Sequence, residues 1–292
     1  MHSLFSNVSV SMNDVVIEGG SSLYPYKAAI ESELCTNKES KATQLGPIGH
    51  GSRDERHKLV GNSSLFELAG ALRLDFLNQP KYLIPGVNVR IVLTRSTADF
   101  ALSYKIGDPE PADGTWKIVM TKALLYVRRV KVHPTVFKAH QLGLQTKNAL
   151  YPYTRSKVVS FAIPQGSTSY CKDNLFSSVL LPKLVVIGLV TGAGYTGSVK
   201  HRSLCFKSHN ITGVDLLRNG QCIPYRTGYH CDFSESTYTD VYVRSILQNL
   251  NVLNTNNNCG ITLHDLTDES CLFVFNLTPD FDLRERQIYA LI

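Results

Sequence analysis

The sequence predicts an all-β protein whose strands form sandwiches or jelly rolls, one in each half of the 292-residue chain. Three observations lead to this class. Apolar and polar residues alternate at period two in many segments. Pro, Gly and Asn stand at the turns between these segments, and few stretches suit a helix. A parallel sheet covered by helices is therefore disfavoured.

The clearest strand follows a turn at Pro85-Gly86. Apolar side chains then recur at every second position, at Val87, Val89, Ile91 and Leu93. This spacing places them on one face of a strand and gives no single helical stripe. We expect residues 87–95 to form a half-buried antiparallel strand whose apolar face packs on an opposite sheet.

The other elements of the first half follow from the same patterns. Residues 4–10 and 15–17 flank a polar Met12-Asn13-Asp14 turn as two strands. Residues 27–34 suit a short helix, because Ala28, Ala29 and Glu31 are acceptable helix residues. A long polar loop is expected at residues 35–61. Further strands are expected at residues 65–77, 100–104 and 116–132.

The best helix prediction in the chain covers residues 134–144. Pro134 suits a first helical turn, and the apolar residues that follow give an i, i+4 face. We place the domain boundary just after this helix, so that residues 1–148 and 149–292 form separate units. In the second unit, strands are expected at residues 158–163, 184–190, 211–217, 241–247 and 271–277, with an Asn-rich loop at residues 249–258.

The composition is that of a folded globular protein. Hydrophobic residues make up 43% and charged residues 18% of the chain, which excludes disordered and fibrous classes. The net charge of +6 is modest, because 24 acidic residues offset most of the 30 Lys and Arg. Residues 1–17 lack the basic start and apolar core of a secretory leader, and the apolar run at 184–190 is too short for a bilayer. We expect a soluble protein that is not secreted and makes no membrane contact.

Seven cysteines are scattered along the chain without a compact framework, at positions 35, 171, 205, 222, 231, 259 and 271. An odd number without regular spacing favours reduced thiols in an intracellular protein over a disulfide-stapled secreted one.

One motif imitates a dinucleotide-binding fingerprint. Gly192, Gly194 and Gly197 form a G-x-G-x-x-G after an expected strand, and Asp215 follows 18 residues later. The fingerprint requires a helix whose N-terminus receives the pyrophosphate. Residues 198–210 have no helical apolar face, so we interpret the motif as a Gly-rich loop.

A cluster of potential zinc ligands also lacks the required spacing. Five residues fall within 27 positions, namely Cys205, His209, Cys222, His230 and Cys231. None of them forms the paired C-x-x-C or H-x-x-x-H arrangement that places two ligands on one turn. No phosphate loop, H-E-x-x-H or G-x-S-x-G motif occurs either. We predict no enzyme activity, no catalytic or metal-binding residues and no cofactor.

Two basic clusters occur, one at Arg128, Arg129 and Lys131 and one within residues 53–58. Neither is interleaved with aromatic residues as a single-strand binding platform is. We interpret them as a solvated strand edge and a solvated loop, with weak sequence-independent contact with nucleic acid kept as an alternative.

Taken in order, several segments resemble one family, the double jelly-roll major capsid protein of Polinton (Maverick) transposable elements and related adintoviruses. The match runs over almost the whole chain, and its specificity lies in the order and spacing of the pieces. They comprise residues 4–6, 8–12 and 24–26; 85–96; 123–134; 161–164; 173–176 and 181–183; 219–224; and 275–280.

The resemblance implies a virion structural protein. It implies two eight-stranded jelly rolls side by side, and three copies forming a pseudo-hexagonal capsomer of an icosahedral shell around double-stranded DNA. The implied partners are two further copies, a single jelly-roll penton protein and, non-specifically, the packaged DNA. The family has additional strands before residue 4 and after residue 280, so we expect both jelly rolls to be incomplete at the termini.

We therefore expect a capsid protein that assembles inside the host cell. The alternative is a jelly-roll carbohydrate-binding or cupin-like protein. Cupin chemistry needs a close His-x-His pair, which this sequence lacks. A lectin would be favoured if the chain were secreted and glycosylated at Asn7 or Asn210.

Overall fold

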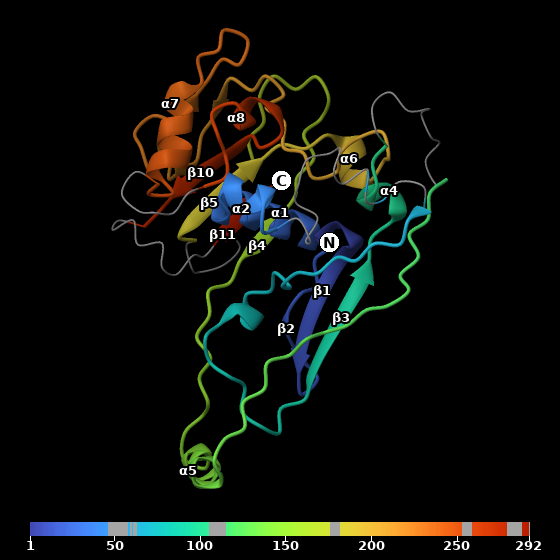
Figure 1. Ribbon diagram of the computed structural model, residues 1–292. Coiled ribbons are helices and arrows are strands. Elements are labelled where there is room, and N and C mark those ends of the chain that lie inside the picture. Colours follow the sequence, from blue (N-terminus) through green and yellow to red (C-terminus); the bar gives the residue numbers. More distant parts are fainter. Residues whose placement is uncertain are drawn as a thin grey trace.

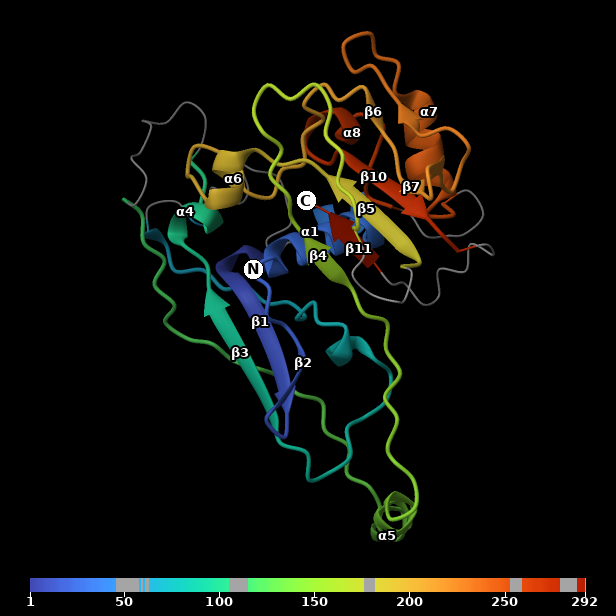
Figure 2. The ribbon, with the colours of Figure 1, turned by 180° about the vertical axis from the view of Figure 1, so that it is seen from behind.

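The computed structural model describes residues 1–45, 58, 60, 63–104, 115–175, 182–252, 259–278 and 288–291. Within them the strands form small, mostly antiparallel sheets, accompanied by short helices. Figures 1 and 2 show three parts: a three-stranded sheet near the middle, a four-stranded sheet with helices above it, and an extended arm that ends in a single helix.

The three-stranded sheet contains the N-terminus. After the short 3₁₀ helix η1 (His2–Leu4), β1 (Phe5–Met12) pairs with β2 (Val15–Glu18) and with β3 (Val89–Arg95), both antiparallel. Asn13 and Asp14 make the β1–β2 turn with positive φ angles of 46° and 65°, which these short polar residues tolerate. The strands and the polar turn predicted from the sequence are confirmed here.

One face of this sheet covers a small hydrophobic core built on Val8 and Val10. The same face continues over β3, where Ile91 packs against this core but the expected burial of Val89 and Leu93 is wrong. Val89 is 37% exposed and Leu93 is 41% exposed, because no second sheet lies over β3 among the described residues. The prediction of the strand is confirmed, while its apolar face is left half open.

The four-stranded sheet has the order β10-β5-β11-β4. β5 (Leu184–Gly188) and β10 (Leu272–Asn276) are antiparallel, whereas β11 (Ile288–Leu291) runs parallel to both β5 and β4 (Lys157–Val159). The strands expected at 184–190 and 271–277 are confirmed. The one expected at 158–163 is limited to β4.

Both faces of β5 and β10 are buried. On one face, Val186 and Val274 pack with Tyr26, Ile30 and Leu34, which recur at every fourth position of α1 (Tyr24–Cys35). On the other face, side chains of the same strands pack in a second core, with members Val185, Phe273, Phe275, Tyr229, Val241 and Leu266. α1 confirms the helix expected at 27–34. It brings N-terminal residues into the core of the C-terminal sheet, and the boundary at residue 148 stays a prediction.

Residues 241–247 were expected to form a strand and are helical instead. α7 (Thr239–Val241) continues into the π-helical segment η5 (Tyr242–Gln248). Ser245 Oγ accepts a hydrogen bond from Val274 N at 2.7 Å, and Asn249 Nδ2 donates to Val274 O at 2.5 Å. In the helical conformation, Ser245 and Asn249 can both form hydrogen bonds with β10. These tertiary contacts outweigh the preference for a strand that the alternating sequence indicates.

Residues 65–77 also differ from the expected strand. The only regular secondary structure in this segment is at its end, where the 3₁₀ helix η4 (Phe76–Asn78) begins. The backbone N–H groups of Asp75 and Phe76 donate to the Glu18 carboxylate at 2.9 Å each, rather than to a neighbouring strand. Leu74 and Phe76 are nevertheless buried in the core under β1.

Other expectations are corrected on a smaller scale. In place of a strand at 100–104, α4 (Ala98–Ala101) occupies the start of that segment. The strand expected at 211–217 divides into β6 (Gly213–Val214), which pairs with β9 (Tyr229–His230), and β7 (Leu217–Arg218), which pairs with β8 (Gln221–Cys222). The loop at 35–61 begins with α2 (Lys38–Ala42). Residues 46–57, 59, 61 and 253–258 of the expected loops lie outside the described residues.

Residues 115–150, which we call the arm, leave the body of the protein as an extended chain and carry α5 (Pro134–Leu144) at its far end (Figures 1 and 2). The helix has the bounds predicted from Pro134, and His133 Nδ1 accepts a hydrogen bond from Thr135 N as its cap. The strand expected at 116–132 is wrong for the isolated chain, because these residues pair with no strand that the structure describes.

The fold class is therefore confirmed only in its general form. The sheets are small and mostly antiparallel, and neither a barrel nor a pair of eight-stranded sandwiches closes within the described residues. Those residues contain no helix long and apolar enough to cross a membrane.

Candidate functional site

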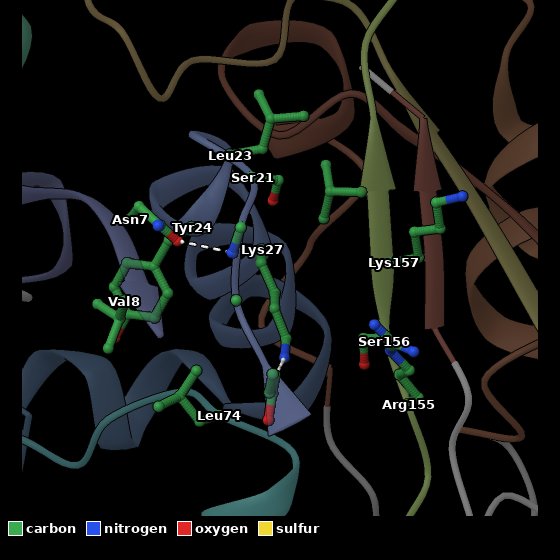
Figure 3. A pocket seen from close by; sticks show the side chains of 14 residues that line it. Asn7, Val8, Ser21, Leu23, Tyr24, Lys27, Leu74, Arg155, Ser156 and Lys157 are labelled. Atoms are coloured by element: carbon green, nitrogen blue, oxygen red, sulfur yellow. Dashed lines mark hydrogen bonds and ion pairs between the residues drawn. The ribbon is translucent and has the colours of Figure 1, made fainter. Parts of the chain in front are cut away.

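A cavity of about 240 Å³ lies between the two sheets. Fourteen residues line it, drawn from β1, β2, the connection between β2 and α1, the start of α1, Leu74 and residues 155–158. Figure 3 shows the Lys27 side chain reaching an ion pair at one end of the cavity, with Arg155 and Ser156 on the neighbouring segment. The cavity therefore joins segments that are far apart in the sequence.

A buried ion cluster lies at the wall of this cavity. Its members Glu18 and Lys27 line the cavity, and Glu31 and Asp75 lie behind them. Lys27 Nζ lies 2.8 Å from a carboxylate oxygen of Glu18 and 2.8 Å from one of Asp75. Glu31, one helical turn from Lys27, lies 3.9 Å away. All four side chains are at most 12% exposed. One cation thus faces three carboxyl groups that are almost completely buried.

Backbone and side-chain donors complete the cluster. Both carboxylate oxygens of Glu18 accept hydrogen bonds from backbone N–H groups at the start of η4. Asp75 accepts from the backbone N of Ser156 at 2.6 Å and from its hydroxyl at 3.2 Å. Charge-assisted bonds of this kind are stronger than neutral ones, so the cluster fixes β2, α1, η4 and the approach to β4 against one another.

The pKa values in the cluster are shifted because three carboxyl groups share one cation and all are buried. Burial raises the pKa of Glu31 to about 7, and the attraction of Lys27 only partly opposes this. Burial also raises the pKa of Asp75, again against the effect of Lys27. For Lys27 burial acts to lower the pKa, but the three carboxyl groups outweigh it and the pKa is raised. Glu31, the most distant from the ammonium, is the group that holds a proton near neutral pH.

The chemistry available in the cavity is limited. A carboxyl group with a pKa near 7 suits general acid–base catalysis, but Glu31 is not among the residues that line the cavity. Glu18 and Asp75 are already satisfied by Lys27 and by the donors around them. We conclude that the role of the cluster is structural: it holds β2, α1, η4 and the approach to β4 together.

Little in the local sequence predicts this cluster. Its members are separated by up to 57 positions, from Glu18 to Asp75. The one local signal was the i, i+4 pair of Lys27 and Glu31 in the helix expected at 27–34. Such pairs are common on exposed helix faces, and nothing in the local sequence marks this one as buried.

The G-x-G-x-x-G motif forms a five-residue helix of its own, α6 (Gly192–Thr196), which ends at Gly197 with a φ of 96°. The helix that a dinucleotide site requires after the motif does not follow within residues 198–210. A side chain at Gly194 would lie 2.9 Å from the carbonyl oxygen of Arg202 and from Thr191 Oγ1. Close packing accounts for this glycine, and Asp215 lies exposed beyond β6.

The potential zinc ligands do not come together. No group of three or more His, Cys, Asp or Glu residues in the described chain is placed to hold a metal ion. Cys205 and Cys231 are buried, and the Cys231 thiol donates to the carbonyl oxygen of Ile211 at 3.2 Å. His209 and His230 are exposed. All seven cysteines are free thiols.

The arm presents the most unusual surface of the described chain. Every residue from 119 to 150 is exposed. Thirteen of the 26 large apolar side chains that are exposed in the described chain lie there, including Tyr126 at 89%, Leu124 at 63% and Leu142 at 64%. The basic cluster of Arg128, Arg129 and Lys131 belongs to the same segment, while residues 53–57 of the other cluster lie outside the described residues.

Comparison with known proteins gives one relative of limited similarity. The chain is 27% identical over 252 residues to the uncharacterized protein F54H12.2 of Caenorhabditis elegans. The alignment covers 83% of this chain and 58% of that protein, so the chain corresponds to little more than half of the relative's length. No protein-family model matches the chain, and no solved structure matches it.

Proposed function

We propose that this chain is a self-associating structural protein of the double jelly-roll capsid type. Three copies would form a capsomer, and capsomers would tile a shell that assembles inside the host cell around double-stranded DNA. The ordered resemblance of segments from residue 4 to residue 280 supports this assignment. A single jelly-roll protein would occupy the vertices.

The observation that carries the proposal is the exposed apolar surface of the arm. A soluble monomer rarely exposes large contiguous apolar patches, and those that occur mark interaction sites. The arm concentrates half of the exposed large apolar side chains of the described residues in 36 positions. A chain whose function is to bind copies of itself needs such a surface.

The half-open face of β3 supports the same function. Val89 and Leu93 belong to a strand whose sequence is patterned for burial, yet both are more than a third exposed. In a capsid protein, neighbouring copies can cover faces that the single chain leaves open. The finer architecture, two jelly rolls side by side, is part of this proposal.

The test is the state of association of the full chain. Purified protein would be measured by analytical ultracentrifugation from low to high micromolar concentration and imaged by negative-stain electron microscopy. We expect trimers with a pseudo-hexagonal outline and larger curved assemblies as concentration rises. A monomer that persists at every concentration and ionic strength would overturn the proposal.

A further inference from the structure

Two segments that are far apart in the sequence adjoin at the end of α1, and each carries a cysteine. Cys259 Sγ donates a hydrogen bond to the carbonyl oxygen of Glu33 at 3.6 Å. A Cβ atom placed on Gly260 would lie 2.5 Å from the carbonyl oxygen of Thr36. The segments thus touch at Cys259 and at the residue after it. Cys35, the last residue of α1, lies between Glu33 and Thr36 on the facing segment.

This contact is anchored on both sides. The Glu33 carboxylate accepts a hydrogen bond from Ser270 Oγ at 3.3 Å and pairs with Lys41 Nζ at 2.7 Å. After Gly260 the chain enters the hydrophobic core at Ile261, and this is the same core that receives the apolar face of α1. Because these contacts are tertiary, folding itself brings the two cysteine-bearing segments together.

The environment of Cys259 combines burial with nearby charges. Burial raises the pKa of this thiol to about 11. The backbone N–H of Ile261 and the ammonium of Lys41 oppose the rise, whereas Glu33 and Cys35 add to it because a thiolate would be repelled by their negative charges. The two cysteines therefore interact electrostatically as well as lying on segments in contact.

Access to an oxidant distinguishes this pair from the cysteines of the cores. Cys35 is exposed and Cys259 is partly exposed. Cys231 raises the pKa of Cys271, so these two thiols also interact. Their side chains are only 6% and 0% exposed, however, and Cys205 is likewise buried. A dissolved oxidant can reach Cys35 without unfolding the protein.

We infer that Cys35 and Cys259 form a disulfide when the protein meets an oxidising pool of thiols and disulfides. The thiolate of Cys35 attacks one sulfur of glutathione disulfide and releases a glutathione thiolate. Cys259 then gives its proton to solvent, and its thiolate attacks Cys35 Sγ and displaces the second glutathione. Two protein thiols are oxidised, and one glutathione disulfide is reduced to two thiols.

The bond joins the end of α1 to a segment 224 positions later. A cross-link over so long a loop removes conformational freedom from the unfolded chain and so favours the folded one. It secures the packing of the N-terminal helix on the C-terminal sheet. Both thiols stay reduced in the cytosol, so the bond forms only after the protein leaves that compartment. The inference goes beyond the proposed function and does not depend on it.

Peptide mapping of the full chain tests the pairing directly. Dilute protein would be incubated with mixtures of reduced and oxidised glutathione, quenched with N-ethylmaleimide and digested with trypsin and Asp-N without reduction. Asp-N cuts before Asp265 and so separates Cys259 from Cys271. We expect mass spectrometry to show the peptide of Cys35 joined to that of Cys259, and dithiothreitol to separate them.

Thermal unfolding of three variants tests the consequence of the bond. Cys35→Ser and Cys259→Ser each remove one partner, and the matched control is Cys171→Ser at another exposed cysteine. Oxidation should raise the midpoint of the unsubstituted protein and of the control by roughly 5–10 °C. It should leave both variants unchanged. Cys35 is exposed, so Cys35→Ser keeps the test decisive even if Cys259→Ser proves poorly folded by circular dichroism.

The pH dependence of closure tests the role of the buried thiol. Protein carrying glutathione on Cys35 would be isolated at pH 5 and transferred to pH 7, 8 and 9. Because the pKa of Cys259 is raised to about 11, release of glutathione should accelerate about tenfold per pH unit. Tyr242, which also faces Cys259, has a pKa raised above 10 and stays protonated over this range. A rate that is the same at all three pH values would overturn the assignment.

The other outcomes are equally decisive. If the oxidised protein carries only mixed disulfides with glutathione, or links Cys35 to a second chain or to another cysteine, the inference fails. The same holds if oxidation raises the thermal midpoint of Cys35→Ser as much as that of the control. None of these readouts measures association, so the proposed function stands or fails separately, by ultracentrifugation.

Discussion

Replacement of Glu31 by Gln should make the protein more stable at alkaline pH than the unsubstituted chain. Glu31 is buried beside Lys27, Glu18 and Asp75, and burial raises its pKa from 4.5 to about 7. The folded chain therefore binds the Glu31 proton more tightly than the unfolded chain does. Stability from this group is complete below pH 4.5 and decreases as pH rises toward 7, above which it is constant.

The size of the effect follows from the difference between the two pKa values. One unit corresponds to 1.36 kcal/mol, so deprotonation of Glu31 removes about 3 kcal/mol by pH 8 and about 1 kcal/mol by pH 5. Gln has the shape of the protonated acid and does not titrate. The stability advantage of Glu31→Gln should therefore grow by about 2.5 kcal/mol between pH 5 and pH 8.

Urea unfolding followed by far-UV circular dichroism is a suitable assay, because Trp116, the single tryptophan, stands at the start of the arm and would report poorly on the core. Free energies from linear extrapolation would be compared at pH 5, 6, 7 and 8. The control is Glu67→Gln, an exposed glutamate whose replacement should change stability by less than about 0.5 kcal/mol at each pH.

A constant difference between Glu31→Gln and the unsubstituted protein at all four pH values would refute the reasoning. It would mean that Glu31 is as well solvated or as well paired in the folded chain as in the unfolded chain. A difference that grows as pH falls would refute it as well, since it would indicate a stabilising ion pair with Lys27.

Three further predictions concern the same core and its neighbours. Lys27→Met leaves three buried carboxyl groups without a cation and should destabilise the chain by about 3–5 kcal/mol in urea unfolding, with a larger loss at pH 8 than at pH 5. Asn249→Ala removes the buried bonds to Tyr229 Oη and Val274 O and should reduce stability by about 1–3 kcal/mol; an unchanged thermal midpoint would contradict this role. Gly194→Ala places a methyl group against the Arg202 carbonyl and should lower stability by about 1–3 kcal/mol, while calorimetry with NAD should show no binding before or after the change.

Much of the local structure could be predicted from short-range patterns. The turn at Asn13 and Asp14, the strand after Gly86 and the helix that begins at Pro134 all form where the sequence indicates them. In each case the determining residues lie within a few positions of the element. Steric limits at Pro, the tolerance of Asn and Asp for positive φ, and side-chain alternation act over that range.

Pairing and burial could not be predicted in the same way. Residues 241–247 alternate as a strand would, yet they become helical because Ser245 and Asn249 bond to β10. Residues 116–132 have the pattern of a strand and have no neighbour in the single chain that the structure describes. The candidate site depends on Glu18, Lys27, Glu31 and Asp75, whose proximity is a product of folding.

By itself the sequence determined that antiparallel strands would be common, where the principal turns lie and where the two longest helices form, because these depend on the preferences of neighbouring residues. The tertiary structure alone decided which strands pair, which faces are buried and where one lysine meets three carboxyl groups, because these depend on contacts between distant segments. The arm and the free edge of β3 each lack a partner strand, because no segment of the described chain pairs with either.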